Sequence, residues 1–132
     1  MILLDTNVLI HFLKGNAGIV AAIRNTPRGE LAIPAIVVFE LEYGTLRSRW
    51  PEQRCRELSR GLGPILRMPF DTEAALAAAN IRVELEMQGM AIGPLDLMIA
   101  GTARSCGALL VTNNTAEFSR VAGLRIADWR SE

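Results

Sequence analysis

Residues 2–14 of the chain read ILLDTNVLIHFLK. The three aliphatic residues at the start favour a short buried strand, and Asp5 closes it. From Asn7 onward the apolar residues recur with the period of a helix. The segment therefore predicts a strand that passes directly into a helix, with a carboxylate at the junction.

The same alternation of short aliphatic runs and helical patterns continues to the end of the 132-residue chain. We expect strands near residues 2–5, 30–33, 66–70, 108–112 and 124–127. We expect helices near residues 7–14, 17–25, 34–46, 51–61, 72–88, 94–106 and 116–121. This order predicts an α/β fold in which helices enclose a mainly parallel central sheet, within a single domain spanning residues 1–132. Functional groups of such folds gather beyond the carboxyl ends of the strands, where Asp5 is expected.

The composition excludes several classes of protein. Half of the residues are apolar, yet the apolar runs are far shorter than the roughly 20 residues that cross a bilayer. The start of the chain does not resemble a signal peptide, so we expect a cytoplasmic protein. One histidine and two cysteines without close spacing argue against a multi-histidine metal site, a zinc knuckle or a disulfide framework. Because 14 basic residues balance 14 acidic ones, a uniform basic field for nucleic acid is also absent.

Three acidic residues occur where a fold normally places apolar or neutral residues: Asp5, Glu40 and Asp96. Asp5 has an alternative interpretation as a helix N-cap, and Asp96 as an acid in the first turn of a helix, where the helix dipole favours it. Glu40 is expected to emerge within an apolar helix stripe, so its carboxylate requires a cation, an arginine or hydrogen-bond donors.

Together the three carboxylates indicate a divalent-metal site. Hard cations such as Mg²⁺ take oxygen ligands, and several acids in one pocket repel each other unless a cation compensates their charge. A receiver domain or a haloacid-dehalogenase-like phosphatase also places an aspartate after its first strand. Both generally use a late lysine, however, and Lys14 is the only lysine of this chain.

Four segments in order resemble the PIN-domain family of metal-dependent nucleases, and within it the VapC-type toxins: LDTNVLIHFLK, IVVFELEYG, GPLDLMIAGTAR and LLVTNNTAEFSRVAGLRIADW. The resemblance covers essentially the whole chain. It implies a Rossmann-like three-layer α/β/α sandwich and an endoribonuclease that uses Asp5, Glu40 and Asp96 with Mg²⁺ or Mn²⁺. It also implies a structured RNA substrate such as transfer, ribosomal or messenger RNA, a VapB-type antitoxin partner and a homodimer.

The chain departs from the family pattern after the fourth expected strand. Many members carry a fourth acid at the position of Asn114, and an amide contributes no negative charge. Glu117 is a candidate substitute, and Thr112 a candidate for positioning a metal-bound water. The alternative is a catalytically inactive PIN-fold module that binds RNA or protein without cutting.

Arginines between residues 47 and 54 are the candidate RNA contacts. Arginine presents a planar fork that suits phosphate, and 13 of the 14 basic residues of the chain are arginines. The candidates are Arg47, Arg49 and Arg54. A solvated helix edge is the alternative interpretation of this segment.

Overall fold

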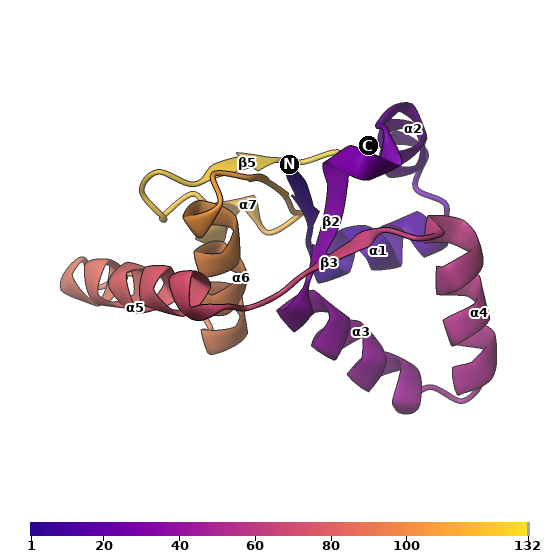
Figure 1. The fold of residues 1–132 in the computed structure, drawn as a ribbon, viewed down its shortest axis with the longest axis horizontal. Helices are drawn as coiled ribbons and strands as arrows, with labels where there is room; N and C mark the ends of the chain where they lie inside the picture. The colour runs from indigo at the N-terminus through magenta and orange to yellow at the C-terminus, as the bar shows by residue number, and fades with distance from the viewer. Residues whose placement is uncertain (132) are drawn as a thin grey trace.

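Five strands form one parallel sheet in the order β3-β2-β1-β4-β5 in the computed structural model, which describes residues 1–131 (Figure 1). The strands are β1 (Ile2–Leu4), β2 (Leu31–Pro34), β3 (Leu66–Met68), β4 (Leu109–Val111) and β5 (Arg125–Ala127). The helices are α1 (Thr6–Leu13), α2 (Ala17–Asn25), α3 (Ala35–Leu46), α4 (Pro51–Leu62), α5 (Thr72–Met87), α6 (Pro94–Ser105) and α7 (Thr115–Phe118), and a 3₁₀ turn, η1, spans Arg28–Glu30. The predicted α/β class and the parallel sheet are confirmed.

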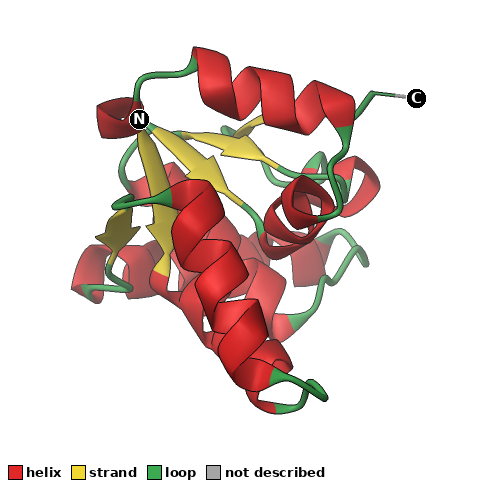
Figure 2. Cartoon of the chain, turned by 90° about the vertical axis from the view of Figure 1, so that its right-hand side faces the viewer, coloured by secondary structure: helices red, strands yellow, loops and turns green. Residues whose placement is uncertain are grey.

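Helices cover both faces of the sheet. Successive side chains of a strand point to opposite faces, and yet the consecutive residues Leu3 and Leu4 are both fully buried. Leu110 and Val111 in β4 are fully buried as well. A strand buried on both sides requires a helical layer on each face, which gives the three-layer α/β/α arrangement (Figure 2).

The chain order creates a switch point between β1 and β4. From β1 the chain adds β2 and then β3 on one side, and it later adds β4 and β5 on the other side. Connections diverge at such a point and leave a crevice beyond the carboxyl ends of the strands. The residues that follow β1 and β4, Asp5 and Thr112, lie at this crevice, and the Asp5 N–H donates to the Val111 carbonyl at 3.0 Å.

Close contact between α5 and α6 holds the helix that carries Asp96. A Cβ on Gly101 of α6 would lie 2.7 Å from the Ala74 carbonyl oxygen and 2.7 Å from the Ala78 Cβ, both in α5. Only a residue without a side chain permits this approach. The two helices cross at the left of Figure 1.

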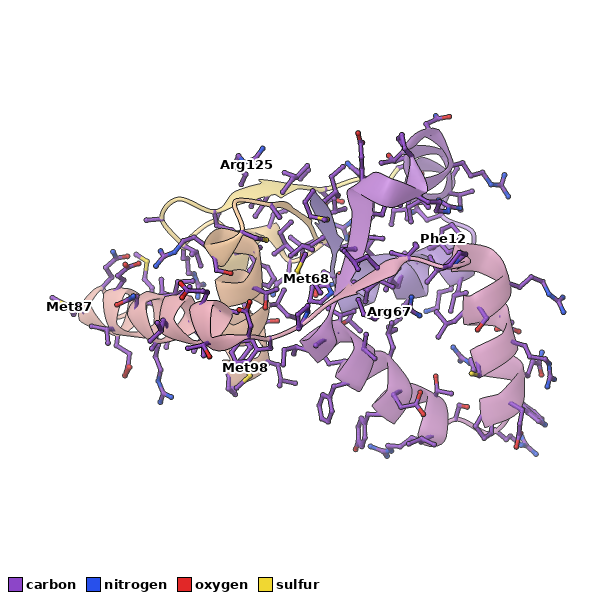
Figure 3. All side chains as sticks on the ribbon, viewed as in Figure 1. Phe12, Arg67, Met68, Met87, Met98 and Arg125 are labelled. Carbon is purple, nitrogen blue, oxygen red and sulfur yellow. The ribbon has the colours of Figure 1, made fainter. Side chains whose placement is uncertain are left out.

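Helices α3 and α4 form a hairpin, and both of them contact α1. Figure 3 shows Phe12 of α1 beside the C-terminal end of α4, and a Cβ on Gly61 there would lie 2.9 Å from the Phe12 ring.

Cys55 of α4 and Cys106 are both exposed and unpaired. Among residues 1–131 no single helix is long and apolar enough to span a bilayer; α1 and α2 would meet that criterion only as a pair bent by 105°.

Two local predictions were wrong. Pro34 was expected to start the helix that contains Glu40, but it is the last residue of β2 and precedes α3. Glu40 was expected to emerge within an apolar helix stripe, but Tyr43, three residues further along α3, is 54% exposed. Helical periodicity identifies residues on one face, but it does not say how far along the helix the core extends.

Candidate active site

Asp5 is the most deeply buried acid at the crevice, with an exposed fraction of 4%. Its Oδ1 accepts a hydrogen bond from the Thr6 N–H at 2.8 Å, and its Oδ2 accepts one from the Thr112 hydroxyl at 2.7 Å. Burial raises the pKa of Asp5, these two donors lower it, and the charge of Glu40 raises it; the net direction is upward. Asp5 therefore caps α1, and its burial makes the charged form of the carboxylate energetically unfavourable.

Glu40 is held from the neighbouring helix. The Thr6 hydroxyl of α1 donates to Glu40 Oε1 at 2.7 Å, which joins two residues that are 34 positions apart in the sequence. The sequence required a partner for this half-buried carboxylate, and the hydroxyl of Thr6 is that partner. Thr6 thus links Asp5 and Glu40 by donating its N–H to one and its O–H to the other.

Asp96 lies in the first turn of α6, two residues after Pro94. Burial raises the pKa of Asp96 to about 6, with further contributions from the charges of Asp5, Glu117 and Glu40 and from a side-chain hydrogen bond with Glu117. The charges of Asp5 and Glu40 thus both act on Asp96, although the three acids come from the junction of β1 and α1, from α3 and from α6.

Glu117 of α7 supplies a fourth carboxylate at this site, since its charge acts on Asp96. Asn114 plays a different part: its backbone N–H donates to the Thr112 hydroxyl at 3.0 Å and it precedes α7. Thr112 donates in turn to Asp5, so it orients that carboxylate. The acid missing at residue 114 is thus present three residues later, which weakens the case for an inactive module.

The donor set fits a hard divalent cation. The groups gathered at the site are carboxylate and hydroxyl oxygens, which suit Mg²⁺ or Mn²⁺ better than zinc. Within residues 1–131 no three acidic, histidine or cysteine side chains stand close enough together to enclose an ion as they are. Mg²⁺ usually binds through one or two carboxylates, with water and substrate phosphates as its other ligands, so a closed protein cage is not required.

The structure separates the three candidate RNA contacts. Arg47 donates to the Tyr43 hydroxyl at 2.9 Å and covers the Tyr43 ring, and Arg49 lies 4.9 Å from the centre of the Trp50 ring. Both are at the tip of the α3–α4 hairpin. Arg54 of α4 lines a cleft that also contains Thr6 and Glu40. Of the three arginines, Arg54 is therefore the one that shares a cleft with Glu40.

Sequence reasoning assigned Thr6 no role at the site. The available signal was its position directly after Asp5, because a hydroxyl at the first helical residue can reach a neighbouring helix. It also missed Trp50, whose 60% exposure for a large aromatic residue becomes visible only in the fold.

Comparison with known proteins places this geometry in a family. The PIN domain model matches residues 2–124. Over 127 residues the chain is 41% identical to "tRNA(fMet)-specific endonuclease VapC" of Shigella flexneri and 37% identical to the Salmonella typhimurium protein of the same name, with 96% of both chains covered in each case. Among solved structures, DNA-bound VapBC of Salmonella typhimurium matches with a TM-score of 0.90 at 36% identity, covering 97% of each chain. VapBC2 of Rickettsia felis, bound to a promoter DNA fragment, matches with a TM-score of 0.88 at 32% identity, covering 98% of this chain and 99% of that one.

The chain belongs to the PIN-domain family. Its relatives within that family are VapC ribonucleases, the toxins of VapBC toxin–antitoxin systems, so the resemblance seen in the sequence is confirmed. The protein is accordingly an endoribonuclease of the toxin type.

Proposed function

We propose that this endoribonuclease depends on Mg²⁺ or Mn²⁺ and cuts initiator transfer RNA, and that it acts in the cytoplasm. The main support for the proposal is that three carboxylates, those of Asp5, Glu40 and Glu117, act on a fourth, Asp96, beside the switch point of a parallel sheet. The substrate is suggested by the relatives that are 41% and 37% identical and bear the name tRNA(fMet)-specific endonuclease.

In the proposed mechanism Asp5 and Asp96 would hold the cation, directly or through water, and Glu117 would add negative charge beside them. The ion, when bound, stabilises charge on the phosphoryl oxygens of the scissile group. Glu40 orients the attacking water and accepts its proton, while the hydroxyl of Thr6 fixes the carboxylate of Glu40. The departing oxygen of the cleaved strand takes a proton from solvent, and the products are two RNA fragments.

The test is cleavage of an initiator transfer RNA transcript in MgCl₂, in MnCl₂ and in EDTA. We expect one cut in either metal and none in EDTA, with an elongator transfer RNA cut at least tenfold more slowly. Glu40→Gln is expected to lower kcat at least a hundredfold, whereas Glu42→Gln, an exposed glutamate on the same helix, should leave it unchanged. Full activity in EDTA, or equal kcat for the two variants, would contradict the mechanism.

We also propose a VapB-type antitoxin as the physiological partner. Several similar structures were solved as VapBC complexes. In support, a groove of about 370 Å³ runs between α3 and α4, with apolar walls that include Leu41, Leu58 and Leu62. Coexpression with the product of the adjacent gene should yield a complex that fails to cut RNA; recovery of free, active toxin from that coexpression counts against this partner.

A homodimer is the third proposal. Large apolar side chains are exposed on two helices, among them Phe39 of α3 and Leu76, Val83 and Met87 of α5. Met87 projects from the end of α5 and is 84% exposed (Figure 3). Exposed apolar groups in such numbers favour association. Light scattering at 10 µM protein should report a dimer, and Leu76→Glu combined with Val83→Glu should report a monomer.

A further inference from the structure

The tip of the α3–α4 hairpin carries a surface hollow of about 240 Å³. Its lining consists of Ser48, Arg49, Trp50, Gln53, Arg54 and Glu57. Trp50 is 60% exposed, and the Arg49 guanidinium lies 4.9 Å from the centre of its ring. An exposed indole with a cation held against it is a platform on which a flat, electron-rich ring can stack.

The hollow carries more positive than negative charge, since Arg49 and Arg54 line it with Glu57 and neither arginine forms an ion pair among the described residues. The ion pairs among residues 1–131 are Arg82 with Glu86, Arg104 with Glu84 and Arg130 with Asp128, all outside the hairpin. Glu57, the acid that lines the hollow, accepts a hydrogen bond from Gln53 at 3.2 Å. Arg49 and Arg54 therefore have donors available for an anionic ligand.

The hollow continues toward the active site through Arg54. This side chain also lines the cleft of about 120 Å³ that contains Thr6 and Glu40. Glu40 and Leu46 are six residues apart on α3, which corresponds to roughly 9 Å along a helix axis. Arg54 is thus common to the cleft that contains Glu40 and to the hollow that contains Trp50, so a polymer that occupies both passes this side chain.

We propose that this hollow is a nucleotide subsite, in which Trp50 stacks on a base of the RNA next to the cut and Arg54 contacts the phosphate between that base and the cut. The inference rests on the proposed ribonuclease function and adds a contact to it. An acidic peptide could pair with the arginines, but it would leave the exposed face of the indole unused. A nucleotide uses both features, because it combines a flat base with an anionic phosphate.

Binding is measured first, separately from cleavage. Trp129→Phe leaves Trp50 as the only tryptophan, so its fluorescence reports on the hollow. With Asp96→Asn added to prevent cutting, a ten-nucleotide single-stranded RNA in MgCl₂ should quench this fluorescence. The same RNA with abasic sites should bind about tenfold more weakly. A glutamate-rich peptide that quenches as strongly as the RNA would overturn the nucleotide assignment.

Cleavage of the transfer RNA transcript supplies the second measurement. Trp50→Ala and Arg54→Ala should each raise KM about tenfold and change kcat less than threefold, and Trp50→Phe should stay within threefold of the parent in KM. Arg56→Ala is the matched control, since this α4 arginine lines neither hollow nor cleft. Circular dichroism melting of each variant confirms that it is folded.

The subsite and the ribonuclease function are overturned by different results. Unchanged KM in Trp50→Ala and Arg54→Ala, with normal cutting by the parent protein, overturns the subsite and leaves the ribonuclease function intact. Base-dependent quenching of Trp50 in a protein that cuts no RNA supports the subsite and overturns the proposed hydrolysis. Equal quenching by normal and abasic RNA overturns the stacking of a base on Trp50.

Discussion

Replacing Asp96 by asparagine should abolish RNA cleavage and yet stabilise the metal-free protein. The pKa of Asp96 is raised from 3.8 to about 6, so the fold favours the protonated carboxyl. That difference is equivalent to roughly 3 kcal/mol when the side chain is fully charged. Because Asp96 is only half-buried, solvent screening reduces the figure, and we expect about 1–2 kcal/mol.

Proton linkage fixes the direction in which the stability of the wild-type protein changes with pH. A carboxyl whose pKa is higher in the folded state than in the unfolded state binds its proton more tightly when folded. The wild-type protein therefore loses stability as the pH rises from about 4 to about 6, and it has lost the whole contribution above that range. Asp96→Asn does not titrate, so its advantage over the wild type should be absent near pH 4 and complete at pH 7.5.

Guanidinium unfolding followed by circular dichroism, in EDTA at pH 7.5 and at pH 4, measures this difference. Adding MgCl₂ at pH 7.5 should then stabilise the wild type more than the variant, since a ligand that binds only the folded state raises its stability. A variant that is less stable than the wild type at pH 7.5 in EDTA would refute the reasoning. So would an advantage of equal size at both pH values.

Three further substitutions test the supports of the site. Glu117→Gln removes one charge that raises the pKa of Asp96, so it should weaken Mg²⁺ binding by about tenfold in titration calorimetry and bring the pKa of Asp96 down. Thr112→Val removes a hydrogen bond that lowers the pKa of Asp5; the acid limb of the pH dependence of kcat/KM should move to higher pH, with a loss of about 1–3 kcal/mol in unfolding free energy. Gly101→Ala should cost about 1–3 kcal/mol in the same unfolding measurement despite the better helix propensity of alanine, because its Cβ meets the backbone of α5; a stabilised variant would show that α5 moves aside freely.

The element order and the sheet were predictable because their signals are local. Aliphatic runs followed by helical periodicity located each of the five strands and the seven α-helices, with ends that differ by a few residues. The turn η1 at Arg28–Glu30 was not predicted, since three residues leave no periodic pattern. Placing Asp5 at the site also needed only local information, because an acid that ends a parallel strand lies at the carboxyl edge of the sheet.

The partners of these acids were not predictable in the same way. The bond between Thr6 and Glu40 spans 34 residues, and the one between Thr112 and Asp5 spans 107. No pattern along the chain encodes which hydroxyl meets which carboxylate, because that depends on how the helices pack. The choice between Asn114 and Glu117 has the same origin: both follow β4 closely, and only the start of α7 decides which side chain faces Asp96.

The distribution of donors explains why the acids of one site are not equivalent. Asp5 accepts a hydrogen bond from the Thr112 hydroxyl and Glu40 accepts one from the Thr6 hydroxyl, so part of their negative charge is balanced by the protein itself. Every influence that shifts the pKa of Asp96 raises it, and none of them is a donor to its charged form. A cation placed among these groups therefore gains most from Asp96, whereas the hydroxyls mainly fix the positions of Asp5 and Glu40. Within one crevice, Asp96 thus makes ion binding energetically favourable, whereas the hydroxyls of Thr112 and Thr6 fix the positions of Asp5 and Glu40.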